Sequence, residues 1–407
     1  MGHKAKGVLA AVLGLACALG GCTSSGSAGT TSTTSVGGSA LPVPVAPQLT
    51  PQPTLGPAEG QLNLIARAGY AENGSNSKDV DWVTPFTENT GCTVNVKIAS
   101  TSDQLVDLMK TGKYDGVSAS GDVTGRLIQE GDVAPVNTTL VPNYTTISSF
   151  LKDRPWNSVK QQMYGIPHGW GANLLVSRRD LVTPAPDSWA AVFDLDSPYK
   201  GRVTSYDSPI SLADAALYLK AAQPELKIAN PYELDDAQFQ AVVALVKQQH
   251  GLIGEYWSDY LKEVNAFESG ASVIGTSWQV IASLVDAGGK AKVNAIIPKE
   301  GATGWSDTWM ISSRAKNPNC MYKWMDWITS PTVNAQVAEW FGEAPAQTLA
   351  CAQTTEKNFC QTFHATDDAY AAKLAYWTTP DTACGDARGN VCKDYSAWRR
   401  AWSQITS

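Results

Sequence analysis

The sequence predicts a mixed α/β protein of two lobes, each with a mostly parallel sheet flanked by helices. Two observations predict this fold class. Strand-like and helix-like segments alternate between residues 62 and 131, and a second alternating series fills the middle of the chain. In addition, 407 residues are enough for two or three compact units at roughly 100–200 residues each.

The first series has the order strand-helix-strand-helix-strand-helix. Alternating or continuous apolar runs predict strands at residues 62–65, 93–98 and 114–117. Amphipathic runs predict helices at residues 80–87, 103–109 and 124–129, with Gly91 and Gly131 as stop signals. Strands joined through helices pair in parallel, so this order predicts a parallel sheet.

The second series repeats the style without an internal repeat of fixed period. Strands are predicted at residues 171–176, 201–205, 272–275 and 293–297. Helices are predicted at residues 211–219, 235–248, 321–328 and 331–341. The final stretch, residues 369–405, is predicted to be helical with a cysteine-bounded loop inside it.

The N-terminal segment has the pattern of a secretory leader. Lys4 and Lys6 precede an apolar stretch, residues 7–19, that is too short to span a bilayer comfortably. Leu19-Gly20-Gly21-Cys22 resembles the bacterial lipobox, in which the cysteine is lipidated and becomes the mature N-terminus. The alternative is an ordinary cleaved signal with a chance cysteine. We therefore expect residues 1–21 to be a signal peptide and Cys22 to anchor the protein at the extracytoplasmic side of the cell membrane.

Residues 22–60 differ sharply in composition from the rest. A Ser/Thr/Gly-rich run is followed by a Pro-rich run from Pro42 to Pro57, and neither has periodic apolar residues. Such sequences form flexible and then stiffer, extended linkers. We expect a tether that holds the folded part away from the membrane.

The cysteines fit an oxidising compartment. Six remain once Cys17 in the leader and Cys22 are set aside, an even number that suggests three disulfides, although six cysteines allow 15 pairings. Two pairs are close enough in sequence to bridge loops locally, which would leave a long-range link between the other two. The expected pairs are Cys351 with Cys360, Cys384 with Cys392, and Cys92 with Cys320.

Composition and motifs argue against several functions. The formal net charge is −7 with no basic block, which makes nucleic acid a poor partner, and no apolar run after the leader is long enough to span a bilayer. The chain has no GxSxG, HExxH, Walker or strand-linked GxGxxG motif, and its histidines are scattered. We expect no catalytic residue, cofactor or metal. A glycosidase with a pair of acids stays possible, because carboxylates are plentiful.

Aromatic residues with a polar group dominate over phenylalanine. The chain has 14 Trp and 14 Tyr but only eight Phe. Indole and phenol rings suit ligand clefts, where they stack on sugars or cations while N–H and O–H groups orient the ligand. The alternative for each ring is core packing, which we expect for Trp324 and Trp327 on their helix.

Several ordered segments resemble one known family. They include Tyr-Gly-Ile-Pro-His-Gly-Trp-Gly at 164–171, Ser188-Trp189 with Tyr-Lys-Gly at 199–201, and Pro-Lys-Glu-Gly at 298–301 followed by Trp305-Ser306-Asp307. Shorter matches lie at 88–91, 114–115, 315–317 and 338–342. The set is similar to the spermidine/putrescine-binding proteins of ABC importers, and the resemblance runs from about residue 62 to residue 346.

The resemblance implies a two-lobed periplasmic-binding-protein (Venus-flytrap) fold, with the ligand in the cleft between the lobes. The chain would cross between lobes near residues 167–172 and 303–307. Lobe one would then contain residues 61–168 and 306–350, and lobe two residues 169–305 and 351–407. Closure of the hinge on the ligand would create the form that the transporter recognises.

The implied function is that of a monomeric substrate-binding lipoprotein. It would capture a small cationic solute, with a polyamine such as spermidine or putrescine as the leading ligand, and deliver it to ABC permease subunits in the membrane. Three alternatives stay open: another small polar solute on the same scaffold, a surface enzyme acting on glycans, and a sensor module.

The resemblance also implies ligand-binding residues. Trp305 and Asp307 match an aromatic-x-acid element in which the carboxylate holds a ligand ammonium and the ring lies against its methylenes. Trp278 matches another tryptophan of the cleft.

Elsewhere the chain departs from the family pattern, and the remaining site candidates come from these departures. Tyr70 stands near an expected aromatic-polar pair, while Ser120 keeps an expected hydroxyl. Asp122 and Glu343 replace aromatic residues, and Asp207 is the only acid where the family has an acidic cluster. Each buried ammonium of a polyamine needs its own partner, and these three acids could supply it.

Overall fold

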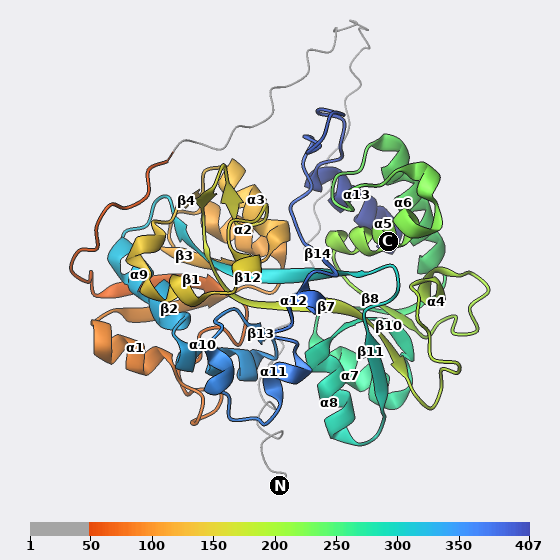
Figure 1. Ribbon diagram of the computed structural model, residues 1–407, viewed down its shortest axis with the longest axis horizontal. Helices are drawn as coiled ribbons and strands as arrows, with labels where there is room; N and C mark the ends of the chain where they lie inside the picture. Colours follow the sequence, from red (N-terminus) through yellow and green to blue (C-terminus); the bar gives the residue numbers. More distant parts are fainter. Residues whose placement is uncertain (1–48) are drawn as a thin grey trace, which may run out of the picture.

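The computed structural model describes residues 49–407, which form two α/β halves joined by two long strands (Figure 1). Strand β7 (Ile166–Arg178) and strand β12 (Ala302–Ser312) run antiparallel across the middle. The predicted signal peptide, Cys22 and the part of the predicted tether before residue 49 lie outside the described residues. Within residues 49–407, no helix combines the length and hydrophobicity needed to cross a bilayer.

The first half is built on three parallel strands in the order β2-β1-β3. Its elements are β1 (Gln61–Ala66), α1 (Val83–Thr90), β2 (Thr93–Ile98), α2 (Ser102–Lys110), β3 (Gly116–Ala119), α3 (Gly121–Gln129), β4 (Val133–Ala134), α9 (Pro318–Ile328), α10 (Pro331–Phe341) and β13 (Ala344–Pro345). Helix α1 ends at Gly91, which adopts the left-handed conformation that glycine tolerates best. The parallel strands end at the same edge, so the loops after β1 and β3 lie close together.

The second half continues the sheet in the order β7-β10-β8-β9. Strand β10 is antiparallel to β7 and parallel to β8, and β8 is parallel to β9. Its elements are α4 (Ala190–Phe193), β8 (Val203–Tyr206), α5 (Leu212–Ala222), α6 (Asp236–His250), β9 (Ile253–Trp257), α7 (Tyr260–Ser269), β10 (Ile274–Trp278), α8 (Gln279–Gly288) and β11 (Val293–Ile296). A capping box between Asp235 and Gln238 fixes the start of α6.

The crossing strands pair with each other between the two halves. Residues Gly304–Asp307 of β12 face Gly169–Ala172 of β7, and a bulge follows at Asp307/Thr308. Beyond this stretch β12 pairs with β3 of the first half, and β7 pairs with β10 of the second. Gly171 is required by close approach, because an added Cβ would lie 2.5 Å from the Trp305 ring. The crossing strands therefore bring the sheets of the two halves together in the middle of the molecule.

The C-terminal segment contacts both halves. Its elements are α11 (Phe359–Thr362), α12 (Asp368–Ala371), β14 (Leu374–Tyr376) and α13 (Tyr395–Thr406). Strand β14 pairs in parallel with β12, and Thr379 Oγ1 donates a hydrogen bond to the Gly121 carbonyl at the start of α3. Helix α13 packs against α6 in the second half. Residues 351–407 were predicted to belong to lobe two. In the structure, this segment also contacts α3 of the first half.

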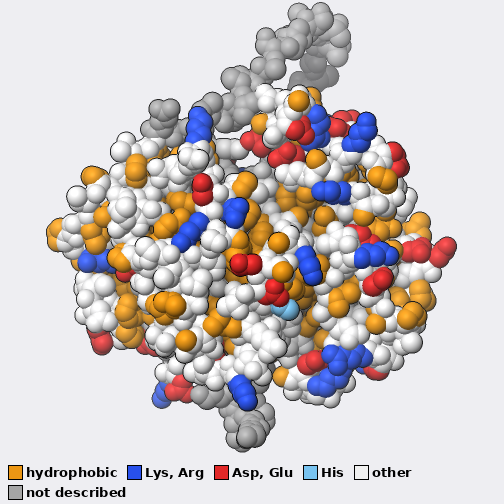
Figure 2. All heavy atoms as spheres, in the orientation of Figure 1, with side chains coloured by type: hydrophobic (Ala, Val, Ile, Leu, Met, Phe, Trp, Pro, Cys, Tyr) orange, Lys and Arg blue, Asp and Glu red, His pale blue; other side chains and the backbone are white. Residues whose placement is uncertain are grey.

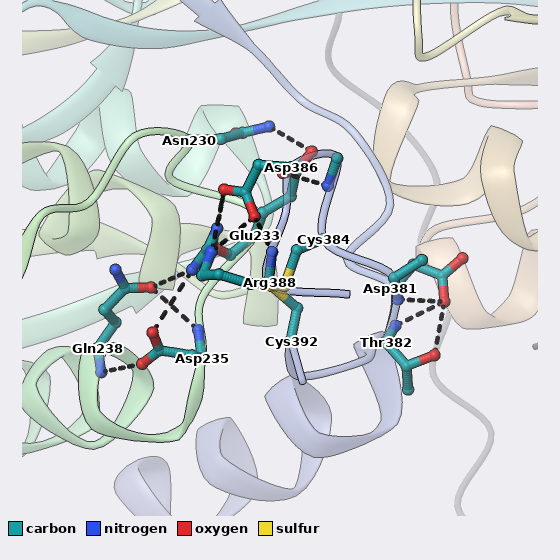
Figure 3. Close-up of a disulfide and its surroundings, with 12 residues drawn as sticks. Asn230, Glu233, Asp235, Gln238, Asp381, Thr382, Cys384, Asp386, Arg388 and Cys392 are labelled. Atoms are coloured by element: carbon teal, nitrogen blue, oxygen red, sulfur yellow. Dashed lines mark hydrogen bonds and ion pairs between the residues drawn. A yellow bond between two sulfur atoms is a disulfide. The ribbon is translucent and has the colours of Figure 1, made fainter. Parts of the chain in front are cut away.

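All three expected disulfides are present. They join Cys92 to Cys320, Cys351 to Cys360, and Cys384 to Cys392. The loop closed by the last pair is held against the start of α6 (Figure 3), where Arg388 donates to Gln238 Oε1 at 2.8 Å and to the Glu233 carbonyl at 3.0 Å. The cysteine count and spacing thus predicted both the bonds and their pairing.

Most predicted elements occur with shifted ends, and two predictions were inaccurate. The strand expected at residues 171–176 is the middle of the 13-residue β7. The helix expected across residues 369–405 is confined to α12 and α13, with β14 and the disulfide loop between them. In both places pairing with β12, which is distant in sequence, determines the local structure.

Candidate functional site

The candidate site lies where strand ends from both halves meet the crossing strands. Tyr70 follows β1 and Ser120 follows β3, while Trp278 is the last residue of β10. Trp305 and Asp307 lie two residues apart on β12, so both side chains project from the same face of the strand. Ligand sites of open α/β sheets form at such carboxyl ends of strands.

Four predicted residues form one buried hydrogen-bonded cluster, which we call the acidic cluster: Tyr70, Ser120, Asp307 and Glu343. The Tyr70 hydroxyl lies 2.5 Å from Asp307 Oδ2 and 2.9 Å from Glu343 Oε2. Ser120 Oγ donates to the other oxygen, Asp307 Oδ1. None of the four side chains is more than 6 % exposed. All four were predicted from the sequence as ligand-binding residues, and the structure brings them together.

The number of hydrogen-bond donors in the acidic cluster limits which of its oxygens can carry a proton. Tyr70 has one hydroxyl proton but two carboxyl neighbours. Burial, reinforced by nearby Asp307, raises the pKa of Glu343 well above its usual range and so favours the protonated carboxyl, a group that can itself donate to the Tyr70 oxygen. Tyr70 is then free to donate to Asp307. The cluster therefore presents one carboxylate, Asp307, held by two hydroxyl donors.

Neutral groups surround the cluster on the β7 side. His168 is fully buried, and burial lowers its pKa to about 4 although Asp307 opposes the shift. Its Nε2 lies 2.8 Å from Ser118 Oγ, and its ring meets the Tyr70 ring edge-on at 4.6 Å. Gly169 leaves room for the Glu343 carboxyl, since an added Cβ would lie 2.0 Å from Glu343 Cδ. These contacts position Tyr70 and Glu343.

Aromatic rings from both halves form a continuous wall beside the acidic cluster. Phe341 stacks on Tyr70 at 4.1 Å between ring centres and lies 6.3 Å from Trp305. Trp305 is 6.0 Å from Trp278, which is 5.4 Å from Tyr206. Trp278, Trp305 and Glu343 also line one pocket. A carboxylate bordered by ring faces suits an ammonium carried on an aliphatic chain.

Trp278 is oriented by a chain of buried hydrogen bonds that crosses the connecting strands. Its Nε1 donates to Asn173 Oδ1 at 2.8 Å, and Asn173 Nδ2 donates to Thr303 Oγ1 at 2.6 Å. Thr303 Oγ1 donates in turn to Asp214 Oδ1 at 2.5 Å. Burial raises the pKa of Asp214 from 3.8 to about 7. A helix of the second half is thus connected to a ring of the aromatic wall.

Asp214 makes stability depend on pH in a defined direction. Its folded pKa exceeds its unfolded pKa, so its contribution is complete below about pH 4 and is lost as pH rises through about 7, a change of about 4 kcal/mol. Asp214→Asn keeps an acceptor for Thr303 but cannot titrate. Urea unfolding between pH 4 and pH 8 is expected to show a smaller fall in unfolding free energy for the variant than for the wild type. Parallel curves for the two proteins would contradict this assignment.

The two other predicted acids lie outside the acidic cluster. Asp122, in the first turn of α3, is buried, and its Oδ2 accepts from Ser102 Oγ at 2.6 Å. Asp207 is exposed beyond the end of β8, and its Oδ1 accepts from Trp402 Nε1 of α13 at 3.0 Å. Asp207 is therefore joined to a C-terminal helix, whereas the neighbouring Tyr206 belongs to the aromatic wall.

Sequence reasoning did not select four residues that the structure places here: Arg67, Tyr206, Phe341 and Trp377. Arg67 and Tyr206 lie at the carboxyl ends of β1 and β8, a position that could have identified them. Trp377 stacks on Tyr206 at 6.0 Å from a distant part of the chain, and no local signal marks it.

The face shown in Figure 2 carries charges of both signs. Lys/Arg and Asp/Glu side chains are interspersed over it, including near the middle of the molecule. Within residues 49–407, no group of three or more His, Cys, Asp or Glu side chains is arranged to hold a metal ion.

Comparisons with known proteins agree with this geometry. Residues 81–379 match the family model of bacterial extracellular solute-binding proteins. The chain is 26% identical over 298 residues to the spermidine/putrescine-binding periplasmic protein of Escherichia coli K12, covering 70% of this chain and 81% of that protein.

Solved structures show the same fold. A putative spermidine/putrescine ABC transporter protein from Listeria monocytogenes superposes with a TM-score of 0.69 at 16% identity, over 85% of this chain and 99% of that one. The spermidine/putrescine ABC transporter substrate-binding protein from Streptococcus pneumoniae gives 0.65 at 17% identity, over 85% and 97%.

Proposed function

The chain belongs to the family of bacterial extracellular solute-binding proteins, and we propose that it captures a small cationic solute between its lobes for an ABC importer. The observation that carries the proposal is the acidic cluster: one buried carboxylate, Asp307, held by two hydroxyl donors beside an aromatic wall built from both halves. Because a buried carboxylate is costly without a positive partner, an ammonium is the natural ligand of this site.

A polyamine is the first ligand to test. The E. coli relative is named for binding spermidine and putrescine. Asp307 and Trp305 occupy the positions that the resemblance assigns to the ammonium and methylene contacts. In this chain the wall extends through Trp278 to Tyr206 of the second half, so a ligand touching it would contact both lobes. Such a ligand favours the closed form, which is the form we propose the membrane subunits recognise.

The test is a thermal-shift panel on residues 49–407 with intact disulfides. It contains putrescine, spermidine, amino acids, choline-like amines and simple sugars. A solute at 100 times its dissociation constant should add about 2.7 kcal/mol of stability, which shifts the melting temperature measurably. A shift with putrescine, spermidine or another amine-bearing solute supports the proposal, whereas a shift with sugars alone contradicts it.

We propose binding without chemistry. Ser118, His168 and Glu343 have the residue types of a hydrolytic triad, but His168 Nδ1 lies 3.6 Å from Glu343 Oε1, beyond hydrogen-bond distance. Ser118 is 2 % exposed, so a substrate cannot reach its hydroxyl in this conformation. The bound solute is expected to be recovered unchanged after denaturation of the complex, as NMR of the released fraction would show.

We further propose that lipid on Cys22 anchors the protein, on the support of the lipobox-like sequence. Cys22→Ala removes the thiol that would carry the lipid and is expected to release the protein from the membrane. Fractionation of cells into membrane and soluble fractions measures this directly. Variant protein retained on the membrane to the wild-type extent would exclude Cys22 as the anchor.

A further inference from the structure

We propose that Arg67 determines which amine-bearing solutes the cleft accepts. The favoured solute carries one ammonium for Asp307 and, at its other end, a carboxylate for the Arg67 guanidinium. Its chemical class is an amino acid with separated charged ends rather than a diamine. This inference rests on the proposed function and narrows the ligand of the same site.

Arg67 is fixed at the edge of the sheet that faces the acidic cluster. It is the residue after Ala66, the last residue of β1. Its Nη1 donates to the Ser100 carbonyl at 2.7 Å, and its Nη2 lies 3.4 Å from Ser102 Oγ. Both serines follow β2, so the guanidinium bridges the carboxyl ends of two parallel strands. Tyr70 projects from the loop after the same strand β1.

Within the described residues, the Arg67 guanidinium keeps a donor, Nε, that can bind a ligand. Within residues 49–407 no carboxylate lies within 4 Å of it, and its Nε donates to no protein acceptor. Burial would lower the pKa of Arg67, but Tyr206, Asp122 and Asp307 together raise it above its ordinary value. A permanent positive charge with an unused donor therefore stands beside Ser102, whose hydroxyl also contacts the buried Asp122. A planar guanidinium of this kind matches a carboxylate in geometry and charge.

The acids of the site offer a charge partner to only one ligand ammonium within the described residues. Burial favours the protonated form of Glu343, whereas the carboxyl of Asp307 accepts from both Tyr70 and Ser120, so Asp307 is the partner that the cluster offers to an ammonium. Asp122 is the competing partner for a second ammonium, since its buried Oδ1 has no hydrogen-bond partner within the described residues. Its Oδ2, however, accepts from Ser102 Oγ, which also neighbours Arg67, so the guanidinium offsets its charge. A diamine would bring its second ammonium toward a fixed cation of like sign.

The test compares ligands matched in length. Binding is measured by calorimetry for unbranched chains of three to six carbons that carry two amines, one amine, or one amine and one carboxylate. The wild type is expected to bind the amino acid more tightly than the diamine at the best length, with the monoamine between them. Arg67→Gln is expected to weaken binding of the amino acid about tenfold or more, because it removes a hydrogen bond to a charged group. The same variant is expected to strengthen binding of the diamine.

Arg67→Lys is the matched control. It keeps the positive charge but loses the planar fork, so discrimination against the diamine should persist while the amino acid weakens less than in Arg67→Gln. Melting temperatures without ligand show whether each variant folds. A diamine that binds the wild type more tightly than the amino acid, with no response to Arg67→Gln, would overturn the inference and leave the proposed function standing. Failure of every amine to bind would overturn both.

Discussion

Asp307→Asn is expected to weaken the binding of an ammonium-bearing solute by about 100-fold or more, because an ammonium buried opposite a neutral amide loses its charge partner. Asparagine has nearly the same shape as aspartate. Its carbonyl oxygen can accept from one of the two hydroxyls that hold Asp307, Tyr70 or Ser120, and its amide N–H group can donate to the oxygen of the other. The melting temperature without solute should therefore stay within a few degrees of the wild type. Calorimetric titration with the tightest solute of the panel measures the change.

Asp207→Asn is the control for this prediction. Asp207 was also predicted as a ligand residue, but its carboxylate is exposed and accepts from Trp402 Nε1 outside the acidic cluster. The same chemical change there should alter affinity less than threefold. Equal losses in the two variants would mean that the effect is general electrostatics rather than direct contact, and unchanged affinity in Asp307→Asn would remove Asp307 from the site.

The different positions of Asp207 and Asp307 show what the sequence could predict about the site. Trp305 and Asp307 are two residues apart on one strand, so a single motif places both on the same face. Tyr206 and Asp207 are adjacent, and at a strand end such neighbours project in different directions. Here Tyr206 faces the aromatic wall and Asp207 faces α13. The composition of that segment predicted an acid near the site but could not predict which neighbour faced it.

Arg67 was missed for a different reason. The resemblance directs attention to acids and aromatic rings that would hold a cation, and an arginine contradicts that expectation. Its position after the first strand was nevertheless visible in the sequence. Trp377 could not be found in this way, because it reaches Tyr206 only through the pairing of β14 with β12.

The difference between local signals and long-range pairing also explains which helices and strands were predicted well. Strand 93–98 and helix 331–341 match their predicted bounds, because periodicity and flanking Gly or Pro residues are local signals. The first part of β7 contains Pro167 and Gly169, which argue against a strand in isolation. Pairing with β12 and the bulge near His168 override that preference. Long-range pairing of this kind leaves no trace in local hydrophobic periodicity.

Removing the Cys92–Cys320 disulfide is expected to be the largest stability change among the three bonds. The two cysteines are 228 residues apart in sequence, and the loop between them includes both crossing strands and the second half. In the chain-entropy model such a loop contributes about 5 kcal/mol, whereas the pair Cys384 and Cys392, only eight residues apart, contributes about 2.5 kcal/mol. Urea unfolding of the two Cys→Ala double variants measures both values.

The local disulfide is a suitable control because other contacts hold its loop. Arg388 and Gly385 bind Glu233 and Gln238 near the start of α6 (Figure 3), and these hydrogen bonds do not depend on the sulfur atoms. The Cys92–Cys320 bond, in contrast, joins the segment after α1 to α9 in the core of the first half. Both of its cysteines are fully buried. The hydrogen bonds of the acidic cluster involve neither pair, so solute affinity should persist in both variants. Equal stability losses would show that cavities left by the buried sulfurs, rather than loop length, decide the effect.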